Sequence, residues 1–250
     1  MSAWFIVAAL FGQIPETPKL HESLGKLPEV HSAELVVAPP SAKITLIHLR
    51  DWHYVPFEDF VTDLDEGATE QEQRQAFGRF LKSVDLVQRD QRMILKRLAE
   101  LGIANVHLEG LTADEERIFP LLCRTLWKGD EQAQFDFDKF TSGPNALSIR
   151  APGQLLAGGE LKRVRAADSD QALIECNPFD ASGSRREVTA AAKERREDYM
   201  VSRMLETGTS VIVLGGAHDL SDNIKRLAAD KAQLVVITPK AYNAASEFDK

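Results

Sequence analysis

The alternation of hydrophobic and polar positions predicts strands and helices that follow one another along most of the chain. Aliphatic runs of the kind found in strands buried on both faces occur at 43–49, 104–110, 161–167, 211–214 and 233–238. Helical periodicity occurs between them, at 69–101, 112–123, 151–159, 185–206 and 221–229. The strand, helix, strand spacing over 211–238 implies a parallel crossover. We therefore predict an α/β fold.

The longest periodic stretch runs from Thr69 to Leu101. It begins with a capping box, Thr69-Glu70-Gln71-Glu72, and Gly102 closes it. Its apolar residues recur at spacings of three and four, which indicates one long amphipathic helix, and Gln91 is the one polar interruption. At about 1.5 Å per residue such a helix would extend roughly 50 Å, so we expect a kink or a break. Its charged residues form a solvated face or, alternatively, mediate homo-oligomerisation.

The N-terminal region differs from the rest of the chain. Residues 1–12 contain an apolar run that is too short to span a bilayer but long enough for the hydrophobic part of a secretory signal, although no basic residue precedes it. The alternatives are export to the periplasm or cell envelope, a buried first element of a cytoplasmic protein, and a misassigned start codon. Residues 13–42 carry five prolines and predict an arm or linker. We place a single α/β domain at 43–250.

Composition narrows the possible functions. A chain of 250 residues with 44% hydrophobic content can bury one sizeable core. The formal net charge of -8 argues against a nucleic-acid partner, and no basic run with interleaved aromatic residues occurs. Cys123 and Cys176 form no CxxC pair, so neither a zinc knuckle nor a disulfide scaffold is encoded. No segment of the sequence reads as a transmembrane helix.

Three predicted strands are followed by, or end in, residues that can act as acids, bases or metal ligands. His218 follows a Gly-Gly pair at the end of the fourth strand, and His53 follows the first strand on a loop with Asp51. Glu109 ends the second strand, where an unpaired carboxylate would be costly, and it is the strongest acid–base or metal-ligand candidate among the carboxylates. Ligands bind beyond the carboxyl ends of strands in open α/β sheets. We therefore expect these side chains to face one crevice.

The loop that carries His53 has two interpretations. A carboxylate two residues from an imidazole can orient the ring, raise its basicity or share a metal with it, which gives Asp51 a role beside His53. Alternatively, the loop is an aromatic turn in which Asp51 shapes the backbone and His53 caps a neighbouring segment.

Other charged and imidazole side chains have weaker signals. Arg196 precedes Met200 by about one helical turn, so it points inward as an oxyanion or carboxylate clamp or, alternatively, belongs to a salt-bridged surface run. His48 lies within the first strand and is expected to be structural. His107 lies within the second strand and is either structural or a support for the site. His21 and His31 are expected to be exposed.

Four short motifs together resemble a known superfamily. They are Asp51-Trp52-His53, Leu108-Glu109-Gly110, Arg196-Glu197-x-x-Met200 and Gly215-Gly216-x-His218, and their order and placement cover roughly residues 43 to 238. In these features the chain resembles the superfamily that contains the erythromycin esterases, the TraB and Tiki proteins and the ChaN haem-binding lipoproteins. The resemblance implies a mixed, largely parallel sheet flanked by helices and a shared pocket formed by His53, Glu109, Arg196 and His218.

The chain departs from the pattern of this superfamily at one place. Arg50 and Asp51 stand where its members usually have Gly or Gly-Glu shortly before the first histidine. The departure changes both the backbone turn and the carboxylate. We also expect Arg50 to lower the pKa of neighbouring carboxylates.

The residues and the resemblance lead to three hypotheses about function. The first is a hydrolase of ester or peptide bonds, with His53 as general base, Glu109 holding its proton and His218 with Arg196 stabilising the oxyanion. A metal-dependent version would use His53, Glu109 and His218 as ligands of a divalent ion. The second is a non-catalytic protein that binds haem or another small ligand, with His53, Tyr54 or His218 as axial ligand. The third is a scaffold that keeps the fold of the superfamily without its catalytic activity.

Overall fold

A largely parallel sheet forms the centre of the molecule. The computed structural model describes residues 20–245, apart from 63, 65–66, 130–144 and 180–184. Within these residues a six-stranded sheet has the order β1-β6-β2-β5-β3-β4. Strands β2 to β6 run parallel, and β1 pairs antiparallel with β6, so the predicted α/β fold is confirmed. The strands are β1 (Val30–Val37), β2 (Ile44–Asp51), β3 (Val106–Leu108), β4 (Val164–Ala166), β5 (Ser210–Gly215) and β6 (Ala232–Pro239).

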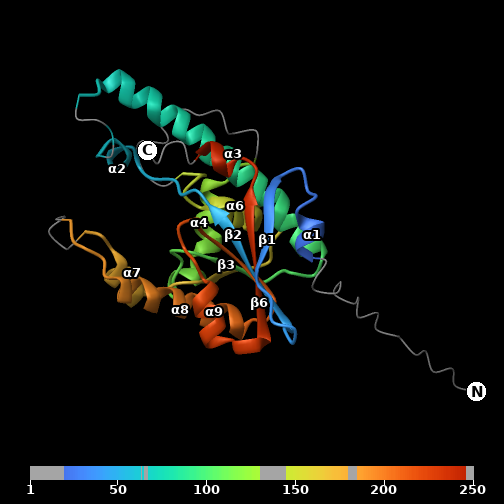
Figure 1. Cartoon of the computed structure of the whole chain (residues 1–250). Helices are drawn as coiled ribbons and strands as arrows, with labels where there is room; N and C mark the ends of the chain where they lie inside the picture. The colour runs from blue at the N-terminus through green and yellow to red at the C-terminus, as the bar shows by residue number, and fades with distance from the viewer. Residues whose placement is uncertain (1–19, 63, 65–66, 130–144, 180–184, 246–250) are drawn as a thin grey trace, which may run out of the picture.

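Helices cover both faces of this sheet (Figure 1). One face is covered by α1 (Leu20–Leu24), α3 (Glu70–Glu100), α4 (Phe119–Leu126) and α6 (Arg150–Gly158), and the other by α8 (Ala190–Glu206) and α9 (Ser221–Leu227). The shorter helical segments are α2 (Phe57–Thr62), η2 (Glu115–Arg117), α7 (Asp170–Cys176), η4 (Ala229–Lys231) and α10 (Tyr242–Ala245). Among the helices described, none combines the length and the apolar character that a membrane span requires.

The sheet begins earlier in the chain than its prolines predict. β1 lies within the segment 13–42, which reads as an arm or linker, yet it pairs with β6 from Val30 to Val37. The prolines of this segment lie outside β1, so every residue of the strand keeps its backbone N–H. The folded sheet therefore starts at Val30 rather than at Lys43. The apolar run at 1–12 lies outside the described residues.

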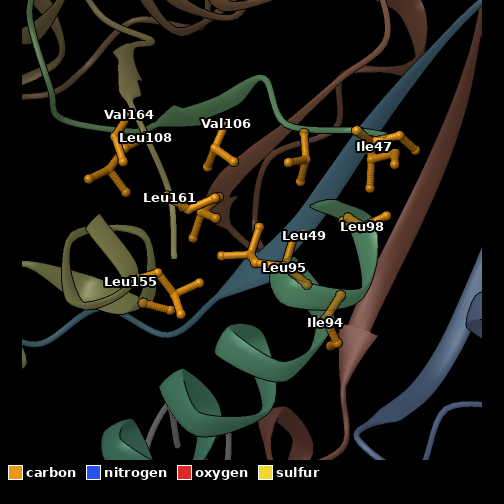
Figure 2. Packing of buried hydrophobic residues seen from close by; sticks show 14 of the residues in the cluster. Ile47, Leu49, Ile94, Leu95, Leu98, Val106, Leu108, Leu155, Leu161 and Val164 are labelled. Carbon is orange, nitrogen blue, oxygen red and sulfur yellow. The ribbon is translucent and has the colours of Figure 1, made fainter. Parts of the chain in front are cut away.

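Alternation along β2 divides its side chains between two hydrophobic cores. Ile47 and Leu49 pack toward Leu95 of α3 on one face, as Figure 2 shows. Leu46 packs on the other face with Met200 of α8. Each fully buried aliphatic side chain of this kind stabilises the fold by about 1.5–3 kcal/mol. Because β2 is held between both layers, the position of its carboxyl end is fixed.

The long helix α3 forms as its sequence predicts at its start and differs from the prediction along its length. The capping box is present, because the Thr69 side chain accepts from the N–H of Glu72 and the Glu72 carboxylate accepts from the N–H of Thr69. The helix then runs for 31 residues without the expected break. The first half of α3 is supported by an aromatic cluster, in which Phe77 and Phe80 pack against Phe60 of α2.

The segment after Thr112 forms two short pieces instead of one helix. The 3-10 turn η2 comes first, and α4 follows with Pro120 in its first turn. Proline is tolerated there because the N–H that it lacks would have no partner within the helix. This arrangement places η2 and α4 beside the carboxyl end of β3.

The buried histidine of β2 gives a prediction about stability. His48 is 1% exposed and its Nε2 lies 3.1 Å from the carbonyl oxygen of Leu214. Burial, partly opposed by this hydrogen bond, lowers the pKa of His48 to about 4. The unfolded chain, with a histidine pKa near 6.5, therefore takes up a proton between pH 6.5 and 4 that the folded protein does not. We expect this difference to remove roughly 3 kcal/mol of stability over that interval.

The measurement is urea denaturation at a series of pH values. The His48→Gln variant should lose less stability between pH 6.5 and 4 than the parent protein, whereas His31→Gln, at an exposed position of β1, should follow the parent. Equal pH dependence in His48→Gln and the parent would contradict the assignment of a neutral buried ring.

Candidate functional site

The carboxyl ends of four parallel strands meet at one edge of the sheet, and the predicted site residues lie there. Asp51 is the last residue of β2 and pairs with Gly215 at the end of β5. Asp51 therefore belongs to the strand. The prediction that it lies on the following loop with His53 is wrong. Glu109 follows β3 directly, and its N–H donates to the carbonyl of Val213 in β5 at 3.1 Å. His53 and His218 lie just beyond β2 and β5.

The carboxylate of Glu109 is the group on which these side chains converge. Its Oε2 accepts from the backbone N–H of Gly215 at 2.9 Å and lies 2.8 Å from Nε2 of His53. Its Oε1 accepts from Nη2 of Arg196 at 3.1 Å and lies 3.4 Å from Nε2 of His218. Burial alone would raise the pKa of Glu109, but its contacts with His218 and His53 hold that pKa well below the usual range. Glu109 is therefore an ionised carboxylate surrounded by donors.

His53 lies between two carboxylates. Its Nδ1 is 2.8 Å from Oδ2 of Asp51, and its Nε2 faces Glu109. A neutral imidazole has a single N–H, so two acceptors favour the doubly protonated ring. Although burial acts in the opposite direction, the hydrogen bonds to Asp51 and Glu109 raise the pKa of His53. The side chain remains 33% exposed, so it is accessible from solvent.

His218 repeats this arrangement from the other side of Glu109. Its Nδ1 is 2.7 Å from Oε1 of Glu197 on α8, and its Nε2 faces Glu109. Burial opposes protonation, but the two carboxylates raise the pKa of His218 to about 9. Two histidines, each paired with a second carboxylate, therefore converge on one glutamate.

The carboxylate of Asp51 is held by side chains from the helices α3 and α6. Its Oδ1 accepts from Nε2 of Gln91 on α3 at 2.8 Å, and its Oδ2 lies 3.5 Å from Nε of Arg150. Burial would raise the pKa of Asp51, but the hydrogen bond to His53 and the charges of His53 and Arg150 lower it. Nη1 of Arg50 donates to the hydroxyl of Thr238 at 3.4 Å, and the lowering of the Asp51 pKa comes chiefly from His53 and Arg150.

Arg196 positions Glu109 through a buried ion pair. Its Nε and Nη2 donate to the two oxygens of Asp168 at 2.7 and 2.9 Å, and Nη2 also donates to Glu109. Asp168 is fully buried and also accepts from the N–H of Gly110 at 2.7 Å. Arg196 thus points inward, as one of its two interpretations predicted. It clamps protein carboxylates, since three of its hydrogen bonds reach Asp168 and Glu109.

The Gly-Gly pair after β5 allows this close packing. A Cβ atom at Gly215 would lie 3.0 Å from Nε2 of His53 and 3.6 Å from Oε2 of Glu109. A Cβ atom at Gly216 would lie 1.8 Å from the hydroxyl oxygen of Tyr242, so Tyr242 would have to move. The backbone approaches the site here because neither residue carries a side chain.

Two other residues considered from the sequence lie away from the group of side chains around Glu109, which we call the Glu109 centre. Tyr54 packs at the edge of the aromatic cluster on α3, and its side chain is hydrogen-bonded to Asn145. His107 contacts the carbonyl of Ala166 and the hydroxyl of Thr207, and burial lowers its pKa to about 4. His107 is therefore a neutral side chain with structural contacts, which is one of the two roles expected for it.

The donor types of the Glu109 centre suit a divalent ion, but their arrangement does not. Imidazoles whose Nδ1 is held by a carboxylate are common metal ligands. However, Nε2 of His53 is already 2.8 Å from Oε2 of Glu109, a direct hydrogen bond between two of the three predicted ligands. Within the described part of the chain, no set of three or more His, Cys, Asp or Glu side chains is placed so that it could hold a metal ion.

Three further residues of the site have sequence signals that the prediction of the site did not use. Gln91 interrupts the apolar stripe of α3, Asp168 follows the strand β4, and Glu197 lies beside Arg196 in the same motif. Each is a polar residue at a position that the surrounding pattern makes buried or strand-terminal. Arg150 has no such signal, because its role depends on a backbone φ of 55° and on contacts far away in sequence.

The Asp168–Arg196 pair gives a prediction about stability. Replacing Asp168 with Asn leaves a buried guanidinium without its bidentate partner, so we expect the free energy of unfolding to fall by about 3–5 kcal/mol. Asp198→Asn on the same helix as Arg196 is the control, because its pair with Arg226 is partly exposed and is expected to contribute about 0–1 kcal/mol. Urea denaturation at neutral pH measures both values, and equal losses would contradict the buried clamp.

No family model, curated protein or solved structure matches the chain. The resemblance to the erythromycin esterase, TraB–Tiki and ChaN superfamily therefore stays a prediction that depends on the four short motifs. What the site does has to be argued from its own chemistry.

Proposed function

We propose that the protein is a hydrolase of ester or amide bonds, with water activated at the His53–Glu109 pair. The main support for this proposal is that the imidazole of His53 lies between two carboxylates. Its Nδ1 is 2.8 Å from Asp51 and its Nε2 is 2.8 Å from Glu109. A carboxylate behind a partly exposed imidazole is the arrangement by which hydrolases orient a general base.

His53 acts as the base in its neutral form. Asp51 keeps the proton on Nδ1, so that Nε2 is the atom that accepts a proton from water. In the resting site two carboxylates raise the pKa of the ring, and Nε2 lies 2.8 Å from Glu109. A ring that carries a proton on Nε2 has to release it to solvent before Nε2 can accept a proton from the attacking water.

His218 supplies the positive charge that a developing oxyanion requires. Its pKa of about 9 keeps the ring cationic at neutral pH, and its side chain is 20% exposed at the same edge of the sheet. A fixed cation at the position where negative charge develops lowers the barrier without reorganisation. Arg196 acts indirectly in this proposal, because its donors hold Glu109 and Asp168.

A metal-dependent version and a haem-binding protein are the alternatives. The first would need Nε2 of His53 to leave Glu109, so we route no step through a metal ion. The second would use His53, His218 or Tyr54, and both ring nitrogens of each histidine already face carboxylates. The hydrolase is preferred because Asp51 orients an imidazole whose side chain is 33% exposed.

The test is hydrolysis of a panel of p-nitrophenyl esters and short peptides by the purified protein. We expect His53→Gln to lower kcat/KM by about 100-fold or more, since general-base catalysis contributes typically 10²–10⁴-fold. His31→Gln is the matched control and should keep the parent rate, and urea denaturation should show that both variants are folded. An unchanged rate in His53→Gln would contradict the proposal.

Two further measurements separate the alternatives. We expect hydrolysis to persist after treatment with a chelator, and loss of activity that zinc or manganese restores would favour the metal-dependent version. A Soret band that forms on haem titration, in a protein that hydrolyses none of the panel, would favour the haem-binding protein instead.

A further inference from the structure

A small cavity lies directly beside the proposed catalytic centre. Its volume is about 220 Å³, and it is enclosed by the end of β3, the turn η2, α4 and the start of α6. Most of its wall is apolar and consists of Leu108, Leu111, Ile118, Phe119 and Leu122. Nothing in the contacts of the centre itself uses these side chains, so the cavity is a separate feature.

The apolar wall has a buried floor and an exposed rim. Leu108, Leu111 and Phe119 are at most 8% exposed, whereas Ile118 is 65% and Leu122 is 42% exposed. Large apolar side chains grouped at the mouth of a concavity mark a binding site more often than single exposed ones do. The cavity therefore opens to solvent past hydrophobic residues.

The polar groups at the edges of the cavity are already used by the protein. The carboxylate of Glu115 accepts from the N–H of Thr112 at 3.1 Å, and the hydroxyl of Ser148 donates to the carbonyl of Asn145 at 2.7 Å. A ligand in the cavity would therefore meet mainly hydrocarbon. This favours an aliphatic group over a sugar or a charged head group.

The inner end of the cavity is shared with the catalytic centre. Glu109 and Arg150 line the cavity, and both belong to the network around His53. Nη1 of Arg150 donates to the carbonyl of Glu109 at 3.0 Å, and its Nε lies 3.5 Å from the Asp51 carboxylate. A chain that fills the cavity would therefore have its attached polar group near Glu109 and Arg150, next to the residues that contact His53 and Asp51.

The size of the cavity limits what it can hold. Its volume is below the roughly 300–1,000 Å³ of pockets that bind drug-sized ligands. A short chain of a few carbons fits this size better than a long one.

We propose that this cavity binds the short aliphatic acyl chain of the substrate, so that the enzyme prefers esters or amides of a short aliphatic acid such as hexanoate over those of acetate. The proposal depends on the proposed function for the chemistry, but the cavity itself can be tested by binding alone. Leu122 is the side chain to change, because it lies on the rim and is partly exposed. Leu121 is its matched control, since it neighbours Leu122 on α4, is 70% exposed and does not line the cavity.

The first measurement is kcat/KM for p-nitrophenyl acetate and p-nitrophenyl hexanoate. We expect the parent protein to prefer the hexanoate by at least about tenfold. Leu122→Glu should abolish this preference for the hexanoate, whereas Leu121→Glu, outside the cavity lining, should keep the parent profile for both esters. Equal rates for the two esters in the parent, or an unchanged preference in Leu122→Glu, would overturn the proposal.

The second measurement is binding of sodium hexanoate and sodium acetate, followed by saturation-transfer NMR without any turnover. Hexanoate should bind to the parent and to Leu121→Glu but not to Leu122→Glu, and acetate should bind to none of them. Hexanoate binding that depends on Leu122, in a protein that hydrolyses no ester, would overturn the proposed function and keep the cavity assignment. Hydrolysis without any effect of chain length or of Leu122 would do the reverse.

Discussion

The buried carboxylate of Glu109 is the constraint on which the arrangement at the edge of the sheet depends. An ionised carboxylate that leaves water is tolerated only when its oxygens are paired with donors. Here the backbone of Gly215 supplies one donor, Arg196 supplies another, and two histidines lie within 3.4 Å. Each of the three side-chain donors, His53, His218 and Arg196, is in turn held by a second carboxylate. These are Asp51, Glu197 and Asp168, so the carboxylates and cations form one continuous network.

The parallel sheet is what makes this network possible. Parallel strands end on the same side, so residues that are far apart in sequence, such as Asp51 and Gly215, become direct neighbours. The two cores hold the strands from both faces, and the helices α3 and α8 contribute Gln91 and Arg196 from opposite layers. The proposed reaction and the proposed acyl-chain cavity are therefore both placed by the same few strand ends.

Local patterns were sufficient to predict much of this. The capping box of α3, the aliphatic strands and the polar residues at the strand ends are all readable within a few residues of sequence, and the structure contains each of them. The edge strand β1 was missed because prolines flank it, and the unbroken length of α3 was missed because its support by α2 is a tertiary contact. Arg150 and the Asp168–Arg196 pair were missed for a related reason. Their importance comes from contacts that join distant segments.

The placement of Tyr54 illustrates the same limit. It lies one residue after His53 in sequence, yet its ring packs in the aromatic cluster and not at Glu109. Neighbouring residues on a loop point in different directions, and composition alone does not say which of them enters a site. Chemical type and position relative to a strand end were better guides here than adjacency.

The most direct test of the account is an NMR titration of the histidine rings, with nitrogen-15 labelling, in the parent protein and in Glu109→Gln. The account predicts that Glu109→Gln lowers the pKa values of His53 and His218 together, because both rings have Nε2 facing this carboxylate. His48, whose pKa is about 4, should stay neutral in both proteins and serves as the internal reference. If only one ring responds to Glu109→Gln, or if neither does, the two histidines do not share Glu109 and the proposed centre is wrong.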